Sequence, residues 1–189
     1  MKSSNNLINH YNKKYQNTFA SETKTVKIAS YPKDRFEITA KLAIKNCKGR
    51  YLEIGAGSGN VALTVINKYD ELILTELSVI RCKELHKLFN NFSKVTIIEH
   101  NIDTENLNFP DDFFNTIVMT AVIEHLVDPI TALKELNRVL CKGGKLIIDT
   151  PNIAKWTRRI KLLLGYFPST ASMDEGLLCY DKKTLTDLL

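Results

Sequence analysis

The chain has 189 residues, of which 44% are hydrophobic and 25% are charged. This composition is typical of a folded globular domain and excludes a disordered, collagen-like or membrane-spanning chain, while the length excludes a second full domain. The net charge of +5 is uneven, because residues 1–50 carry 11 Lys or Arg and 3 acids, whereas residues 51–189 carry 15 and 18.

Much of the basic excess lies in an N-terminal lead-in over residues 1–34. Its lysines are scattered among polar residues, with one adjacent pair at residues 13–14, so we interpret the segment as solvated. Contact with nucleic acid, an anionic membrane or an acidic substrate is the alternative. The segment holds no apolar stretch typical of a signal peptide. Four cysteines occur without a C-x-x-C pair, which predicts reduced thiols, no metal site and a cytoplasmic protein.

From residue 35 onward, short β-branched runs alternate with helical patterns. Strands are expected at residues 51–54, 71–75, 94–99, 116–120 and 145–149. Helices are expected at residues 35–46, 60–68, 78–89 and 129–140, with a last one near 180–189. The alternation is typical of parallel βαβ units, and the near-continuous apolar strands indicate that helices cover both faces of the sheet. We therefore predict an α/β fold with a doubly wound, mostly parallel sheet over residues 35–152.

The segment YLEIGAGSGN places three glycines, Gly55, Gly57 and Gly59, between a strand and a helix. Glycine suits a tight turn whose backbone must approach a ligand closely, next to the N–H groups of a helix N-terminus. A plain strand-to-helix turn is the alternative, but such a turn rarely needs three glycines. A dinucleotide site would need a further glycine at position 60, which is Asn60, so a nicotinamide-dependent oxidoreductase is disfavoured.

The run E-x-G-x-G-x-G, which begins at Glu53, resembles the first motif of class I S-adenosylmethionine-dependent methyltransferases. The later stretch DTENLNFPDDFFNTIVMTAVIEHLVDP is similar to a stretch of that family that usually reads close to DAEELPFPDGSFDLVVASEVLEHVEDP. The resemblance implies a Rossmann-like sheet of seven strands, with S-adenosylmethionine as cofactor and S-adenosylhomocysteine as product. Only five strands are recognisable, so we expect strands six and seven to be missing.

The resemblance also implies which residues hold the cofactor. Glu76, after the second strand, would accept hydrogen bonds from both ribose hydroxyls, which suits a carboxylate because it is an acceptor only. Asp103 would bind the adenine amino group, with its two neighbours beside the ring. Asn115 and Ala121 depart from the usual Asp and the frequent Glu of the family. The expected cofactor-binding residues are Glu53, Gly55, Gly57, Gly59, Glu76, Leu77, Ile102, Asp103, Thr104 and Thr120.

Methyl transfer is an in-line displacement from an activated group, so the protein must position the acceptor and, for a hydroxyl acceptor, remove a proton. Histidine suits that task near neutral pH. His125 follows the fourth strand on the cleft side and is the candidate base, with Glu124 as its orienting partner. The alternative is that this Glu-His pair fixes the loop and caps the next helix.

The acceptor is inferred from a missing motif. Many methyltransferases that act on DNA or amines carry an Asp/Asn-Pro-Pro-Tyr motif after the fourth strand, and this chain lacks it. We therefore expect methyl transfer to a hydroxyl oxygen of a small molecule, with carbon and nitrogen acceptors as open alternatives. A non-catalytic regulatory or partner protein that binds S-adenosylmethionine is one alternative, and a nucleic-acid methyltransferase, supported by the basic N-terminal lead-in, is another.

Residues 153–189 are expected to form an acceptor-side or capping segment. Within it, residues 155–167 read KWTRRIKLLLGYF, with four basic residues and no acid. A basic helix with Trp and Leu is typical of a peripheral membrane-surface element. The alternative is a helix that packs its leucines on the sheet or covers the acceptor pocket. The sequence does not indicate which oligomeric state the protein adopts.

Overall fold

The computed structural model describes residue 9 and residues 35–45, 47–152, 154, 156–165 and 178–189. The rest of the N-terminal lead-in lies outside the described residues, as do residues 155, 166 and 167 of the basic segment. The described strands are β1 (Arg50–Ile54), β2 (Glu71–Glu76), β3 (Val95–Glu99), β4 (Phe114–Thr120) and β5 (Leu140–Asp149). The helices are α2 (Arg35–Ile44), α3 (Asn60–Val65), α4 (Val79–Leu88), α5 (Pro129–Val139), α6 (Trp156–Leu163) and α7 (Lys182–Leu188), with short 3-10 turns η1 (Ile66–Lys68) and η2 (Ile123–His125).

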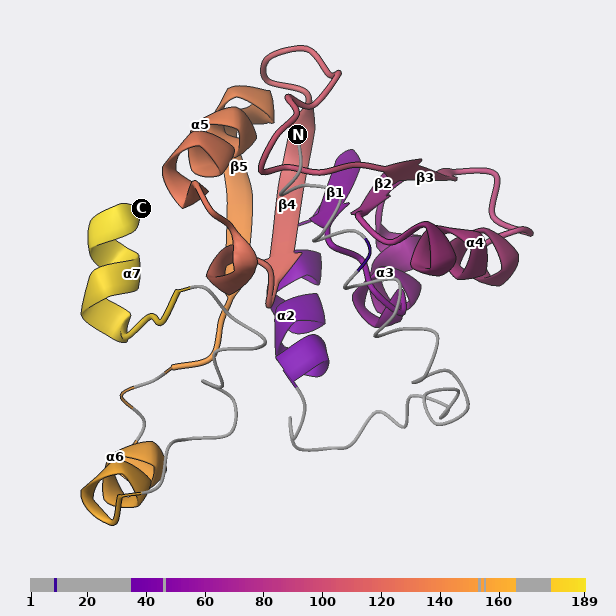
Figure 1. The fold of residues 1–189 in the computed structure, drawn as a ribbon. Coiled ribbons are helices and arrows are strands. Elements are labelled where there is room, and N and C mark those ends of the chain that lie inside the picture. Colours follow the sequence, from indigo (N-terminus) through magenta and orange to yellow (C-terminus); the bar gives the residue numbers. More distant parts are fainter. Residues whose placement is uncertain (1–8, 10–34, 46, 153, 155, 166–177) are drawn as a thin grey trace.

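The five strands form one sheet in the order β3-β2-β1-β4-β5 (Figure 1). Every neighbouring pair is parallel, so all five strands end at the same edge. The chain runs outward from β1 through β2 to β3 and then crosses back to β4, which makes the boundary between β1 and β4 a topological switch point. The predicted doubly wound parallel sheet is therefore confirmed.

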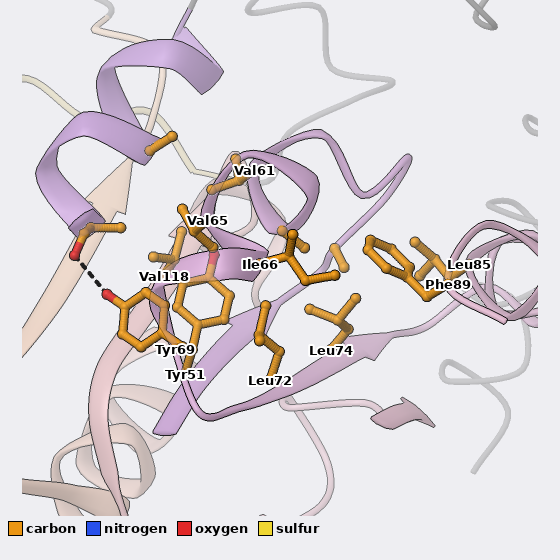
Figure 2. Close-up of a cluster of buried hydrophobic side chains, with 14 residues drawn as sticks. Tyr51, Val61, Val65, Ile66, Tyr69, Leu72, Leu74, Leu85, Phe89 and Val118 are labelled. Carbon is orange, nitrogen blue, oxygen red and sulfur yellow. Dashed lines mark hydrogen bonds between the residues drawn. The ribbon is translucent and has the colours of Figure 1, made fainter. Parts of the chain in front are cut away.

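Successive residues of each strand pack on opposite faces of the sheet, as the pleat requires. Tyr51, Leu72 and Leu74 face a cluster formed with α2, α3 and α4 (Figure 2), whereas Leu52 and Ile73 face a second cluster that includes α5. Burying each of these large side chains contributes about 1.5–3 kcal/mol relative to leaving it in water. Both faces of the sheet are thus covered, which explains the near-continuous apolar strands.

A buried tyrosine, Tyr69, connects helix α2 to the segment that follows α3 and η1. The Tyr69 hydroxyl donates to the carbonyl of Ala43 at 2.6 Å (Figure 2), and its ring lies 5.0 Å from that of Tyr51. The contact holds α2 against the sheet.

The fifth strand begins five residues earlier than predicted. The α5 helix ends at Val139 and Leu140 already pairs with Phe114, after which the register shifts until Lys145 pairs with Thr116. Gly143 has a φ of 75°, so the Gly143-Gly144 pair forms an irregularity inside the strand instead of a helix stop. Sequence reasoning missed this because glycines after a helix usually end it.

The described residues beyond β5 contain no further strand, apart from an isolated bridge between Asn152 and Tyr180. Two side chains of α7, Leu185 and Leu188, pack on the second core cluster, whereas α6 lies apart from the sheet (Figure 1). Among the described helices, none is both long and apolar enough to cross a bilayer.

Candidate functional site

The glycine turn after β1 lies at the carboxyl edge of the sheet, next to the end of β4. All three glycines have positive φ, 67° at Gly55, 54° at Gly57 and 76° at Gly59. A Cβ on Gly55 would lie 2.5 Å from Val122, and one on Gly59 would lie 2.9 Å from Phe89. These two glycines are therefore required by packing inside the protein.

Gly57 differs from the other two glycines. A Cβ built on it would meet open space, with the Gly55 carbonyl oxygen at 4.0 Å as its nearest neighbour. Its backbone is therefore the part of the turn that a ligand can approach.

Glu76 is held beside Gly57 by two backbone hydrogen bonds. Its Oε2 accepts from the N–H of Gly57 and its Oε1 accepts from the N–H of Ser78, both at 2.9 Å. Burial raises the pKa of this carboxyl, and the hydrogen bonds from Ser78 and Gly57 oppose that rise. A carboxylate has about four lone-pair sites, so the fixed group retains acceptor capacity beside the open space at Gly57.

Glu53 lies beneath the turn, inside the protein. It is 3% exposed, and its Oε2 accepts from the Tyr51 hydroxyl at 2.8 Å. Burial raises the pKa of Glu53 to about 8, although the hydrogen bonds from Tyr51 and the backbone of Ala62 lower it. These contacts join β1 to α3, so we interpret Glu53 as a support for the glycine turn instead of a direct ligand contact.

Asp103 follows β3 and joins it to the loop that precedes α5. Its carboxylate accepts from the N–H of Val127 at 2.9 and 3.0 Å and from the N–H of Asp128 at 3.1 Å. Of its neighbours, Ile102 is buried and Thr104 is exposed. The predicted adenine-side residues therefore lie next to the segment that carries His125, and part of the acceptor capacity of Asp103 is used within the protein.

The end of β4 carries an unusual backbone and an unpaired hydroxyl. Ala121 has a φ of 52°, a conformation that costs a non-glycine residue about 1 kcal/mol or more and that is often found at functional sites. Its N–H donates to the carbonyl of Asp149 at 2.7 Å. The Oγ1 of Thr120 is buried and has no hydrogen-bond partner among the described residues, which makes it a candidate ligand contact.

Glu124 and His125 lie on η2, directly after β4. Glu124 is buried; its Oε2 accepts from the Thr150 hydroxyl at 3.0 Å and its carbonyl accepts from the N–H of Leu178 at 2.9 Å. Burial raises its pKa. These contacts favour the alternative in which Glu124 fixes the turn, while the half-buried His125 is presented at the carboxyl edge.

Sequence reasoning missed the residues that surround Glu124. Arg35 lowers its pKa and Asp149 raises it, and the charge of Glu124 contributes to the raised pKa of Tyr180. The Tyr180 hydroxyl is buried without a partner among the described residues. A signal for Asp149 and Thr150 was available, because both directly follow the apolar run of β5 and so lie at the same edge as the glycine turn.

Asn115, the departure from the family's usual Asp, lies at the opposite edge of the sheet. Its Oδ1 accepts from the N–H of Arg50 at 2.9 Å, and a Cβ on Gly49 would clash with it. It therefore ties the start of β1 to the start of β4 and takes no part in the carboxyl-edge site.

A family model described as the methyltransferase domain matches residues 28–189. The chain belongs to this family. Class I methyltransferases use S-adenosylmethionine, and the parallel sheet agrees with the fold of solved members. The recognition made from the glycine run and the second motif is thereby confirmed.

Individual relatives differ in what they act on. The methyltransferase domain is 41% identical over 64 residues to the tRNA U34 carboxymethyltransferase of Campylobacter curvus, covering 34% of this chain and 22% of that protein. It is 27% identical over 103 residues to the ubiquinone/menaquinone biosynthesis C-methyltransferase UbiE of Pectobacterium carotovorum, covering 52% and 41%. The chain thus spans less than half the length of either protein.

A solved structure shows the shared fold over a longer range. YcgJ of Bacillus subtilis matches with a TM-score of 0.65 and 20% identity, covering 81% of this chain and 64% of that one. Because the identity is low, this likeness concerns the fold alone.

The methyltransferase site fits S-adenosylmethionine in three respects. The turn leaves open space at Gly57, Glu76 offers a fixed acceptor beside it, and Thr120 has an unpaired hydroxyl at the neighbouring strand end. Gly57 and Thr120 lie at the switch point between β1 and β4, and Glu76 ends β2, the strand next to β1. Open parallel sheets bind ligands at such a switch point. These residues, with Leu77 after β2, are the ones expected to hold the cofactor.

The Thr120→Val variant should change the affinity for the cofactor product without lowering the stability of the unliganded domain. The buried hydroxyl has no described partner, so its removal should leave the unliganded methyltransferase domain as stable or about 1 kcal/mol more stable. Affinity for S-adenosylhomocysteine should fall about fivefold, because the hydroxyl would lose a ligand hydrogen bond. Urea unfolding and calorimetry measure the two quantities.

The matched control lies on the same strand. Thr116 hydrogen-bonds the Tyr69 side chain, so Thr116→Val should cost stability and leave the affinity unchanged. If Thr120→Val bound the product as tightly as the unmodified chain, Thr120 would not be a cofactor contact.

Proposed function

We propose that this methyltransferase domain transfers a methyl group from S-adenosylmethionine to a hydroxyl oxygen of a small molecule. The observation that carries the proposal is the placement of His125 on the turn directly after β4, on the same edge as Gly57, Glu76 and Thr120. A proton acceptor and a cofactor cradle thus share one edge of the sheet.

The cofactor supplies a methyl group on positively charged sulfur, which needs no further activation by the protein. Glu76, held by Gly57 and Ser78, would bind the ribose hydroxyls of the cofactor, and Thr120 would donate or accept one further hydrogen bond. Burial raises the pKa of Glu53 to about 8 and raises that of Glu76 as well, but the backbone N–H groups of Ser78 and Gly57 favour the ionised form of Glu76. The chain's main contribution on this side is orientation.

On the acceptor side, His125 takes the hydroxyl proton while the oxygen forms its bond to the methyl carbon. The electron pair of the broken carbon–sulfur bond stays on sulfur. Glu124 holds the turn through Thr150 and Leu178, and the bonds of Asp103 to Val127 and Asp128 hold the other side of the turn. Both contacts restrict the position of the histidine.

Replacement of His125 with Ala should lower the single-turnover rate of methyl transfer to a hydroxyl acceptor about a hundredfold, because the general base is lost. Affinity for S-adenosylmethionine should not change. The decline of the rate at low pH should also disappear, since protonation of the base causes it. Rapid-quench measurements across a pH series test these expectations.

The matched control is His86→Ala, because His86 is exposed on α4. It should leave the rate and its pH dependence intact. A His125→Ala variant that transferred methyl groups at the unmodified rate would remove the base assignment.

The non-catalytic alternative is separated by two measurements in sequence. Calorimetry with S-adenosylmethionine and S-adenosylhomocysteine tests the cofactor, and turnover against a panel of hydroxyl-bearing metabolites tests the reaction. Binding without turnover on any acceptor would favour a regulatory or partner protein that holds the cofactor.

A nucleic-acid acceptor is the second candidate function. The 41% identity to a tRNA U34 carboxymethyltransferase over 64 residues supports it, as does the basic excess of residues 1–50. Affinity for bulk tRNA that falls steeply with salt concentration, together with methyl incorporation into the RNA, would favour this candidate. Incorporation only into small molecules would favour the hydroxyl acceptor.

A further inference from the structure

The α6 helix leaves a large apolar surface in water. Leu163 is 85% exposed, Trp156 is 68% exposed and Leu164 is 67% exposed. The helix follows β5 and lies apart from the sheet, beyond the carboxyl edge (Figure 1). Gly165, with a φ of 78°, follows its last turn and donates its N–H to Leu162, which is a typical helix end.

Three exposed apolar residues of α6 share one face of the helix, and Leu164, just after its end, continues that face, whereas Leu162, which is 45% exposed, lies off it. Trp156, Ile160, Leu163 and Leu164 stand at intervals of four, three and one residues, which places them together on a helix of 3.6 residues per turn. The expectation that these leucines pack on the sheet is therefore wrong for the described residues, because both Leu163 and Leu164 are exposed. Two leucines of α7, Leu185 and Leu188, are by contrast partly buried against the second core cluster.

The remaining charges on α6 are all basic. Arg158 donates to the carbonyl of Asn152 at 2.7 Å and so anchors the helix to the chain that leaves β5. Arg159 and Lys161 are exposed, and residues 156–165 contain no acid. Positive charge thus flanks the apolar face.

An anionic lipid surface fits both properties of α6. Its acyl boundary takes up the apolar face and its headgroups attract the basic residues, as in other interfacial amphipathic helices. A nucleic acid would match Arg159 and Lys161 but would leave Trp156 and Leu163 in water. Charge and apolarity together therefore favour the bilayer.

We propose that α6 docks this protein on the surface of an anionic bilayer. Trp156, Ile160, Leu163 and Leu164 enter the boundary between headgroups and acyl chains, and Arg159 and Lys161 bind anionic headgroups. The carboxyl edge of the sheet lies on the side of the protein that carries α6, so docking brings the site close to the lipid. The docking itself does not depend on the proposed methyl transfer.

Trp156 provides a local probe, because it is the only tryptophan of the chain. Vesicles of equal parts phosphatidylglycerol and phosphatidylcholine should shift its fluorescence to shorter wavelength at low salt, and brominated lipid should quench it. Pure phosphatidylcholine vesicles, or high salt, should weaken binding strongly, since the attraction to anionic headgroups is screened. Co-sedimentation with the same vesicles measures the affinity.

Two variants test the two parts of the surface. Leu163→Ser should weaken vesicle binding about tenfold through lost apolar burial. Arg159→Gln/Lys161→Gln should weaken vesicle binding about twenty-five-fold, at about fivefold per charge, and should flatten the salt dependence. The matched control is Leu42→Ser, which changes a half-exposed leucine on a different helix, α2, and should bind vesicles as the unmodified chain does.

Three results would overturn the proposal. One is an unchanged Trp156 spectrum with no co-sedimentation at low salt. Another is equal vesicle binding by the Leu163 and Leu42 variants. The third is binding to bulk tRNA, lost in the double charge variant, without binding to vesicles, which would assign the basic residues to nucleic acid. Unfolding in urea, expected to be equal for all variants, shows that each remains folded.

Discussion

Glu76→Gln should lower the affinity for S-adenosylmethionine and S-adenosylhomocysteine roughly a thousandfold. The carboxylate receives the N–H groups of Gly57 and Ser78 on separate oxygens, and a glutamine offers one acceptor oxygen and an NH₂ group in their place. One backbone N–H would then face a donor, so the side chain would turn away from Gly57. Losing two charge-assisted hydrogen bonds to the ribose, each worth about 1.5–3 kcal/mol, accounts for the magnitude.

Calorimetry with both ligands measures this change, and the other end of β2 provides its control. Glu71 pairs with Arg50 at the opposite edge of the sheet, so Glu71→Gln should bind both ligands as the unmodified chain does. Urea unfolding of Glu76→Gln without ligand separates lost affinity from lost structure. A folded Glu76→Gln variant that bound within threefold of the unmodified chain would contradict the assignment of Glu76.

Much of the fold could be predicted because the signals are local. Apolar runs such as 71–75 and the glycines after β1 specify strands and a turn from neighbouring residues alone, and their alternation with helices implies a parallel sheet. The early start of β5 could not be predicted in this way. Leu140 becomes part of the strand by pairing with Phe114, a contact between residues that are distant in the sequence.

The candidate site shows the same difference between features set by neighbouring residues and features set by contacts between distant residues. The glycine turn and Glu76 follow directly from a motif and from a strand end. The contacts of Asp103 with Val127 and of Glu124 with Thr150 join segments whose proximity depends on the order of the strands. The sequence shows which groups are polar at a strand end, but the fold decides which of them bind each other.

Glu53 and Glu76 show how two nearby carboxyl groups acquire different roles. Both are buried, and the charge of Glu76 contributes to the raised pKa of Glu53. Glu76 has backbone N–H groups on both oxygens, which stabilise its ionised form. Protonation of Glu53 removes a second negative charge from beneath the glycine turn, so the turn can support one ionised acceptor at its surface.

Glu53→Gln should therefore change the dependence of stability on pH. Folding raises the pKa of Glu53 from 4.5 to about 8, so the folded chain retains a proton that the unfolded chain releases. The resulting stabilisation is complete below pH 4.5 and is lost as the pH rises through about 8. Glutamine resembles the neutral acid and does not titrate. The free energy of unfolding of the variant, relative to that of the unmodified chain, should therefore increase by on the order of 4 kcal/mol as the pH rises from 4.5 to about 8.

Urea unfolding of both chains from pH 5 to pH 9 measures this difference, and subtracting one from the other cancels the contributions of groups that both contain.

The Tyr51→Phe variant tests the contribution of the Tyr51 hydroxyl to the pKa of Glu53. The Tyr51 hydroxyl lowers the pKa of Glu53, so without it the loss of stability should occur at a still higher pH. A difference between Glu53→Gln and the unmodified chain that stayed constant across this range would show that Glu53 is ionised in the fold. The turn would then lie above a second negative charge.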